Sequence, residues 1–183
     1  MKRFITIVLV FLFALQLVGQ TKLDSLLFNK VNDYRTSKGF NPMVWDSSVY
    51  NMSSHHTSYL YVVNKNDYRS IAGHNESKDV TNFNEINTPS ERFKKYVNKS
   101  FTYNGENVGF VTRNTKTNDE QMVNVIFEDW KKSEKHNKAM LKSDVKFGAC
   151  SVYILNKKFP IKYKETIREV SMKKGFATFN FYF

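Results

Sequence analysis

The chain has 183 residues, a formal net charge of +11 and 41% hydrophobic residues. This length and composition fit one globular domain, and they exclude a disordered, fibrous or two-domain protein. Of the 28 basic residues, 22 are Lys and only 6 are Arg. Because Arg is the side chain that pairs best with phosphates and bases, we expect no nucleic acid among the partners.

The first 19 residues have the organisation of a secretory signal peptide. Lys2 and Arg3 precede an apolar run over residues 4–18, and the small residue Gly19 follows. We expect cleavage after Gly19 to release a single domain, residues 20–183, with no transmembrane segment; an uncleaved anchor is the alternative. The protein is therefore expected to be secreted or to lie in the periplasm or envelope.

Two amphipathic helices are predicted next. Apolar residues at steps of three and four predict a helix over residues 23–37, and Arg35 is placed to hold it to the core through a carboxylate or backbone carbonyl. Asp46 is placed to cap the second helix. His56 lies on the apolar face of that helix, whereas His55 points about 100° away. We therefore expect His56 in the core and His55 in solvent.

The middle of the chain mixes loops, helices and a strand. Residues 64–87 are polar with little periodicity, which predicts a long irregular segment. The sequence Thr-Pro-Ser-Glu then predicts a short helix over residues 88–98. A strand is predicted over residues 101–111, and a further helix over residues 118–133.

Two strands are predicted at the C-terminus. The first covers residues 145–155, a polar turn follows at residues 156–158, and the last strand, over residues 176–182, is interpreted as a buried edge strand. Cys150 is the only cysteine, so we expect a buried, unreactive thiol. Helices and strands mixed with few regular βαβ units predict an α+β layered domain.

Several segments, taken together, resemble the bacterial branch of the CAP superfamily. This superfamily, also called the SCP domain, groups cysteine-rich secretory proteins, antigen 5 allergens and pathogenesis-related class 1 proteins. The segments are Asn-Asp-Tyr-Arg at 32–35, Gly-Phe-Asn-Pro-Met-Val-Trp-Asp at 39–46, His74, Gly-Glu-Asn at 105–107, Trp-Lys-Lys-Ser-Glu-Lys-His at 130–136, and Phe-Gly at 147–148. The resemblance covers about residues 25–155. It implies a three-layer α-β-α sandwich with a surface cleft where two histidines and acidic residues converge.

The resemblance assigns the cleft to His74, Glu106 and His136. The family's further acidic residue falls at Ser133, so Glu134 is the nearest acidic substitute if the preceding helix continues. Two imidazoles and one carboxylate suit Zn²⁺ or another divalent cation with an open position for water. The predicted metal ligands are therefore His74, Glu106 and His136, and the catalytic candidates are Glu106 and Glu134.

Two other interpretations of the same residues remain open. Without a metal, the trio is an acid/base cluster whose carboxylate raises the histidine pKa values. Alternatively it is a structural network, in which Glu106 binds backbone donors at a turn beside Gly105 and His136 satisfies a helix C-terminus. No nucleophile elbow accompanies Ser133, which argues against a serine hydrolase.

The leading hypothesis is an exported binding module that takes a lipid, glycan or peptide in the His/Glu cleft. The alternative is a metal-dependent, protease-like hydrolase in which Glu106 acts as the base. A third hypothesis is contact with an anionic envelope surface through Lys131, Lys132, Lys135 and Lys138.

Overall fold

The structure is a computed structural model that describes residues 21–66, 73–97, 102–163 and 165–183. The predicted signal peptide lies outside these residues. Within the described ranges, no helix is long and apolar enough to cross a membrane.

The elements of the described chain alternate irregularly between helix and strand. In chain order they are α1 (Lys22–Ser37), β1 (Val44–Trp45), α2 (Ser47–Asn64), α3 (Pro89–Val97), β2 (Tyr103–Asn114), α4 (Asp119–Lys132), α5 (Glu134–Met140), β3 (Phe147–Tyr163) and β4 (Thr166–Tyr182). The strands form one sheet in the order β1-β3-β4-β2. β1 pairs with β3 in parallel, and the other neighbours are antiparallel.

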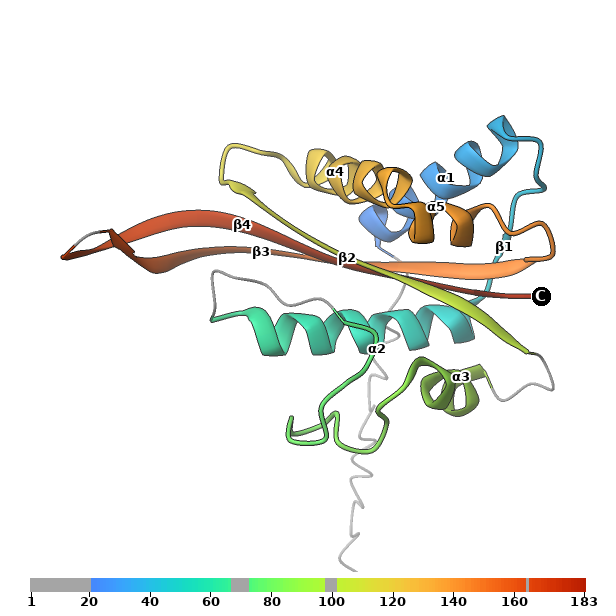
Figure 1. The fold of residues 1–183 in the computed structure, drawn as a ribbon, viewed down its shortest axis with the longest axis horizontal. Coiled ribbons are helices and arrows are strands. Elements are labelled where there is room, and N and C mark those ends of the chain that lie inside the picture. The colour runs from blue at the N-terminus through green and yellow to red at the C-terminus, as the bar shows by residue number, and fades with distance from the viewer. Residues whose placement is uncertain (1–20, 67–72, 98–101, 164) are drawn as a thin grey trace, which may run out of the picture.

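Helices cover both faces of this sheet. α1, α4 and α5 lie on one face, and α2 and α3 lie on the other (Figure 1). The larger apolar core lies between α1, α4 and the sheet, where Leu27, Ile126, Trp130 and Phe179 are buried. A second cluster lies beneath α2 and α3. The predicted α+β fold and three-layer α-β-α sandwich are confirmed.

Capping side chains set the starts of the helices. Thr21 and Asp24 form a reciprocal capping box on α1. Asp46 accepts hydrogen bonds from two backbone N–H groups of the first turn of α2, and Asn118 caps α4. These side chains satisfy N–H groups that have no partner inside the helix. The predicted starts at Asp46 and Asn118 are confirmed.

Arg35 joins α1 to the loops that flank α5 and β1. Its guanidinium is fully buried. Nε donates to the carbonyl of Asn41 at 3.0 Å, and Nη1 donates to the carbonyls of Met140 and Lys142 at 2.6 and 2.9 Å. Nη2 reaches the carbonyl of Val145 at 3.5 Å. The predicted role of Arg35 in holding α1 to the core is confirmed.

The C-terminal strands differ from the prediction in two ways. Residues 156–158, predicted as a turn, lie inside β3 and pair with residues 171–173 of β4. β4 lies between β3 and β2 and is therefore a central strand, not an edge strand. The strands were underestimated because residues 166–171 are exposed, so this part of the hairpin lacks the apolar alternation of a half-buried strand.

Cys150 lies in β3, where its thiol is free and fully buried. Burial raises the pKa of this thiol well above its ordinary value, so the nucleophilic thiolate is disfavoured. The expected buried, unreactive cysteine is confirmed.

Candidate functional site

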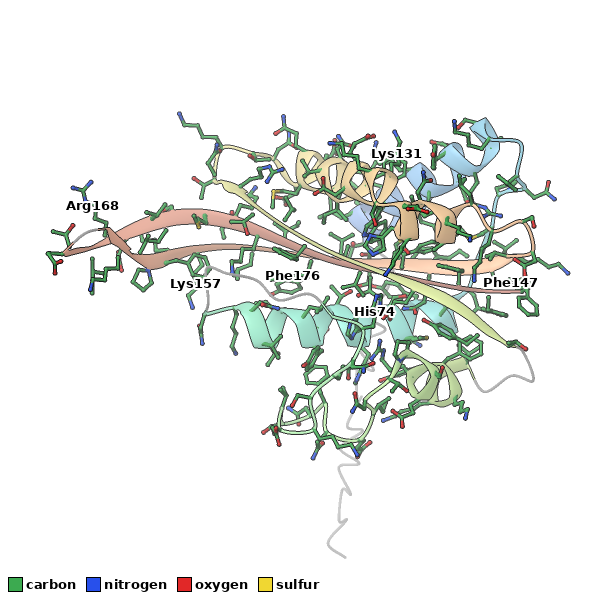
Figure 2. The ribbon with its side chains drawn as sticks, viewed as in Figure 1. His74, Lys131, Phe147, Lys157, Arg168 and Phe176 are labelled. Carbon is green, nitrogen blue, oxygen red and sulfur yellow. The ribbon has the colours of Figure 1, made fainter. Side chains whose placement is uncertain are left out.

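The three predicted cleft residues lie around β2, an edge strand of the sheet. Glu106 of β2 contacts His74, which Figure 2 labels below the sheet on the side of α2 and α3. The next residue, Asn107, points to the opposite face, where its side-chain amide donates to the carbonyl of His136 at 3.1 Å. This alternation follows from the pleat of the strand. The contact of Glu106 with His74 and the contact of Asn107 with the backbone of His136 therefore lie on opposite faces of β2.

Glu106 is held by two partners on the α3 side. Nη2 of Arg92 lies 3.0 and 2.9 Å from its two oxygens, and Nδ1 of His74 lies 3.0 Å from Oε1. Burial raises the pKa of Glu106, but the hydrogen bond from His74 and the charge of Arg92 outweigh it and hold the pKa below its ordinary value. Glu106 is thus an ionised carboxylate whose oxygens already have donors.

Arg92, which the sequence analysis missed, links Glu106 to a second buried carboxylate, Glu76. Nη1 of Arg92 lies 3.2 Å from Oε1 of Glu76, and neither side chain is exposed. Nη2 also donates to the backbone carbonyl of His74 at 2.8 Å. Arg92 therefore fastens the segment that carries His74 and Glu76 to α3 and β2. The available sequence signal is that Arg92 directly precedes Phe93, which is buried on the same helix.

Two histidines and a tyrosine surround Glu76. Nδ1 of His56 lies 2.8 Å from Oε1 of Glu76, and Nε2 of His55 lies 3.0 Å from Oε2. The hydroxyl of Tyr96 lies 2.8 Å from Nδ1 of His55. The prediction of a core position for His56 is confirmed, since it is fully buried. The prediction that His55 is solvated is wrong: its side chain is only 15% exposed, because Glu76 and Tyr96 bind both of its nitrogens.

Glu76 is an ionised carboxylate inside this cluster. Burial raises the pKa of Glu76, but hydrogen bonds from the two histidines and the charge of Arg92 hold it below its ordinary value. Nε2 of His56 lies 2.8 Å from the carbonyl of Gly73, so both nitrogens of this ring have a polar partner. Glu76, Glu106, His56 and Arg92 are all buried, and we call these four residues the buried charge cluster.

His74 is the accessible part of this arrangement. Its side chain is 52% exposed. Because ionised Glu106 can only accept, Nδ1 of His74 carries the hydrogen that it donates. None of the residues that the structure describes hydrogen-bonds the other ring nitrogen, Nε2. His74 is therefore an oriented imidazole that is accessible at the surface.

An apolar groove of about 300 Å³ lies on the other side of β2, between this strand and α4. The residues that line it are Val108, Gly109, Phe110, Ile126, Asp129, Trp130, Ser133 and His136. Gly109 leaves room for the ring of Trp130, because a Cβ at Gly109 would lie 2.8 Å from its Nε1. The same Nε1 donates to the carbonyl of Val108 at 3.2 Å. The groove therefore follows the edge of β2.

His136 lies in the wall of this groove. Burial and the positive charge of His74 lower the pKa of His136 below its ordinary value. The ring is thus predominantly neutral near neutral pH.

Three sequence expectations near His136 are wrong. Helix α4 ends at Lys132, and Ser133 has extended backbone with ψ 117°, so the helix does not continue to place Glu134 on the face of Trp130. Glu134 is exposed and does not line the groove. Ser133 caps α5 by accepting from the N–H of His136, so His136 lies near the start of a helix, not its C-terminus.

Glu106 also differs from the predicted structural network. Gly105 and Glu106 lie inside β2 and pair with β4, so the expected turn is absent there. The carboxylate of Glu106 binds the side chains of Arg92 and His74, not backbone donors. The network interpretation is right in kind, because Glu106 is hydrogen-bonded and buried, but wrong in its partners.

The predicted zinc site does not fit this arrangement. No group of three His, Cys, Asp or Glu side chains within the described ranges is placed to hold a metal ion. Both oxygens of Glu106 are bound by Arg92, whose positive charge opposes a second cation nearby. His74 and His136 remain as nitrogen ligands of the kind that zinc takes.

A larger, polar depression of about 700 Å³ lies between the N-terminal ends of α1 and α4. Its charges pair with one another, because Lys22 lies 2.7 Å from Glu120 and Lys173 lies 2.8 Å from Asp119. It holds no imidazole, and Leu23 is its one apolar lining residue. The groove beside His136 is therefore the better candidate.

Acid is expected to unfold the protein through the buried charge cluster. Because the pKa values of Glu76 and Glu106 are lower in the folded chain than the ordinary 4.5, the folded state binds fewer protons than the unfolded state as the pH falls. Their contribution to stability is complete above pH 4.5 and is lost as the pH falls through the folded-state values. Urea unfolding between pH 7 and pH 3 measures this loss.

Two variants separate this effect from surface charges. Glu76→Gln should reduce the loss of unfolding free energy between pH 7 and pH 3. Glu120→Gln should leave that loss unchanged in about 0.5 M salt, which screens exposed pairs. An equal loss of unfolding free energy in Glu76→Gln and in the unmodified protein would contradict the assignment of this loss to the buried charge cluster. His136 adds a shallower loss in the same direction, which begins as the pH falls through 6.5.

Comparisons with known proteins cover the region that carries this site. The chain matches the model of the cysteine-rich secretory protein family, CAP, over residues 28–159. Its fold is similar to an outer surface protein from Borrelia burgdorferi, with 15% identity, a TM-score of 0.48, and coverage of 90% of this chain and 95% of that one. No curated protein sequence matches the chain.

Two further solved structures are similar in fold. One is an extracellular protein containing an SCP domain from Bacillus anthracis, with 13% identity, a TM-score of 0.49, and coverage of 84% of this chain and 39% of that one. The other is a cysteine-rich secretory protein from Staphylococcus aureus, with 9% identity, a TM-score of 0.44, and coverage of 90% and 40%. This chain therefore spans less than half the length of these two proteins.

Proposed function

Since this chain belongs to the CAP family of cysteine-rich secretory proteins, we propose that it is an exported binding module whose ligand site follows the outer edge of β2. Because one fold serves many functions, the proposal rests on the site and not on family membership. The observation that carries it is the apolar groove with the imidazole of His136 in its wall. Export is proposed on the leader over residues 1–19.

The lining of the groove indicates the kind of ligand. Phe110, which is 41% exposed, offers apolar surface, whereas Ile126, Trp130 and Val108 line the groove but are almost fully buried. His136 is the imidazole among these residues. A concave, largely apolar site with a few polar groups is typical of small-ligand binding. A ligand with an aliphatic or aromatic segment and a hydroxyl or amide donor would fit both parts. Lipids and peptides with apolar side chains have this character more than glycans do.

The hydrolase alternative finds no support in the geometry. A general base must have a free acceptor close to the proton it takes, but Arg92 and His74 already donate to both oxygens of Glu106. The hydroxyl of Ser133 is used as a helix cap. Binding therefore explains the arrangement better than catalysis does.

The test is a set of nuclear magnetic resonance titrations on the exported protein. Decan-1-ol supplies an apolar chain with one hydroxyl, diacetylchitobiose supplies a glycan, and ZnCl₂ supplies the metal. We expect decan-1-ol to shift the amide signals of Gly109 and Phe110 and the indole N–H signal of Trp130 until they saturate. Gly109→Ala should weaken this response, because its Cβ meets the indole of Trp130.

Lys158→Ala, far from the groove, is the control and should respond as the unmodified protein does. If none of the three titrations shifts the groove signals, or if the shifts are equal in Gly109→Ala, the proposed site is wrong. Stoichiometric Zn²⁺ binding that is lost in both His74→Ala and His136→Ala would instead establish the predicted metal cleft and overturn the metal-free arrangement argued above.

A further inference from the structure

β3 and β4 continue beyond the sandwich as a two-stranded ribbon. The last residue pair between β2 and β4 is Asn114 with Met172, whereas β3 and β4 remain paired up to Tyr163 and Thr166. In the part of the chain that the structure describes, no third strand lies beside residues 158–163 and 166–171, and we call these two segments the arm. Figure 1 shows the arm projecting past the ends of α2 and α4. Most of it also lies beyond residue 159, where the family match ends.

The arm combines exposed apolar and basic side chains. Ile167 is 74% exposed, more than any other large hydrophobic residue that the structure describes, and Val170 is 38% exposed. Lys162 lies directly opposite Ile167, and Arg168 lies directly opposite Ile161. Because opposed residues of paired strands share a face, both faces of the arm present an apolar residue next to a cation. Figure 2 labels Arg168 at the far end of the arm.

The acidic residues of the arm do not cancel this pattern. Glu169 lies 3.9 Å from Lys158, and both side chains are more than half exposed. Glu165 lies in the connecting turn. The whole chain has a formal charge of +11, so a surface of negative charge attracts the protein in general and the arm in particular.

An exposed ribbon of this kind calls for a partner of matching chemistry. Two isolated strands are only marginally stable in water, and the transfer of exposed Ile167 out of water lowers the free energy. Apolar side chains that enter the headgroup region of a bilayer, flanked by Lys and Arg that reach lipid phosphates, meet both conditions. The basic patch near His136 lacks this combination, because Phe127 beside it is buried and Lys131 is paired with Glu128.

We propose that the arm docks this protein on an anionic phospholipid bilayer. Ile167 enters the headgroup region, and Lys162 and Arg168 lie against lipid phosphates. The arm is separate from the groove beside His136, so docking would hold the binding module at a membrane surface while its ligand site stays independent.

The test is cosedimentation of the exported protein with lipid vesicles at low ionic strength. We expect binding to vesicles of about one part phosphatidylglycerol to three parts phosphatidylcholine, weak binding to phosphatidylcholine alone, and loss of binding in high salt. Each basic residue near such a surface contributes roughly fivefold in affinity. The double variant Lys162→Glu, Arg168→Glu should therefore bind at least about 25-fold more weakly.

A matched variant separates the arm from net charge alone. Lys132→Glu, Lys135→Glu changes the net charge by the same amount at exposed positions near α5 and should cost much less affinity. Equal losses in the two double variants, or a larger loss near α5, would overturn the proposal. Binding to neither kind of vesicle would also overturn it and would leave a protein as the partner of the arm.

Entry of residue 167 into the bilayer can be measured separately from vesicle binding. In Ile167→Trp, the emission of the new indole should shift to shorter wavelength with anionic vesicles, whereas Val63→Trp, at an exposed position on α2, should show no shift. Trp45 and Trp130 contribute the same background to both variants. An unshifted emission in Ile167→Trp, despite binding, would contradict entry of residue 167 into the bilayer and overturn the docking geometry.

Discussion

Replacing Arg92 by Met is expected to lower the free energy of unfolding by about 3–5 kcal/mol. Arg92 is fully buried, forms an ion pair with Glu76 and donates to Glu106, and both carboxylates are also buried. Its removal leaves two buried carboxylates without the guanidinium that lies between them, and an uncompensated buried charge is the costliest outcome of breaking such a cluster. Urea unfolding at pH 7 measures the change.

A surface position on the same helix supplies the control. Lys95 lies on the same helix and pairs with Glu85 at the surface, so Lys95→Met should change stability little. Adding Glu106→Gln to Arg92→Met should restore part of the loss, because it removes one of the unpaired charges. If Arg92→Met is no more harmful than Lys95→Met, the buried charge cluster does not stabilise the fold as argued here.

Replacing Arg35 by Met is expected to cost about 3–5 kcal/mol as well, for a different reason. Hydrogen bonds from a charged donor contribute about 1.5–3 kcal/mol each, and Arg35 donates to the carbonyls of Asn41, Met140 and Lys142 at 3.0 Å or less. Because Met140 is the last residue of α5 and Lys142 follows it, loss of Arg35 should also shift the resonances of His136. Urea unfolding and a heteronuclear spectrum record both effects.

Arg113 is the matched control for this variant. It is exposed and donates to the backbone carbonyl of Thr112 alone, so Arg113→Met should leave stability and the His136 signal unchanged. If Arg35→Met changes the free energy of unfolding as little as Arg113→Met does, water replaces the lost donors and the prediction is wrong. Arg35→Lys should recover part of the stability, since one ammonium reaches fewer of the carbonyls than the guanidinium does.

Local patterns predicted the elements whose determinants lie within a few residues. Capping by Asp46 and the apolar face with His56 are of this kind, and both are confirmed. The partners of Glu106 could not be predicted in this way, because Arg92 and His74 reach it from separate elements. A short sequence window carries no information on which buried charges meet after the chain has folded.

The strand errors have a related cause. β3 and β4 are paired along their full length, yet their outer parts leave the core and carry polar residues on both faces. Hydrophobic alternation reports burial, not hydrogen bonding to a neighbouring strand. Strand order likewise depends on the pairing of distant segments, so the central position of β4 had no local signal.

That central position has a consequence for biogenesis. β2 and β3 are each joined to β4 but not to one another, so the sheet cannot close until the last strand of the chain has been synthesised. A nascent chain that lacks residues 166–182 has no strand on which β2 can pair. The sheet can therefore be completed only after almost the whole chain has been synthesised, which fits the proposed export of a chain that folds after it has crossed the membrane.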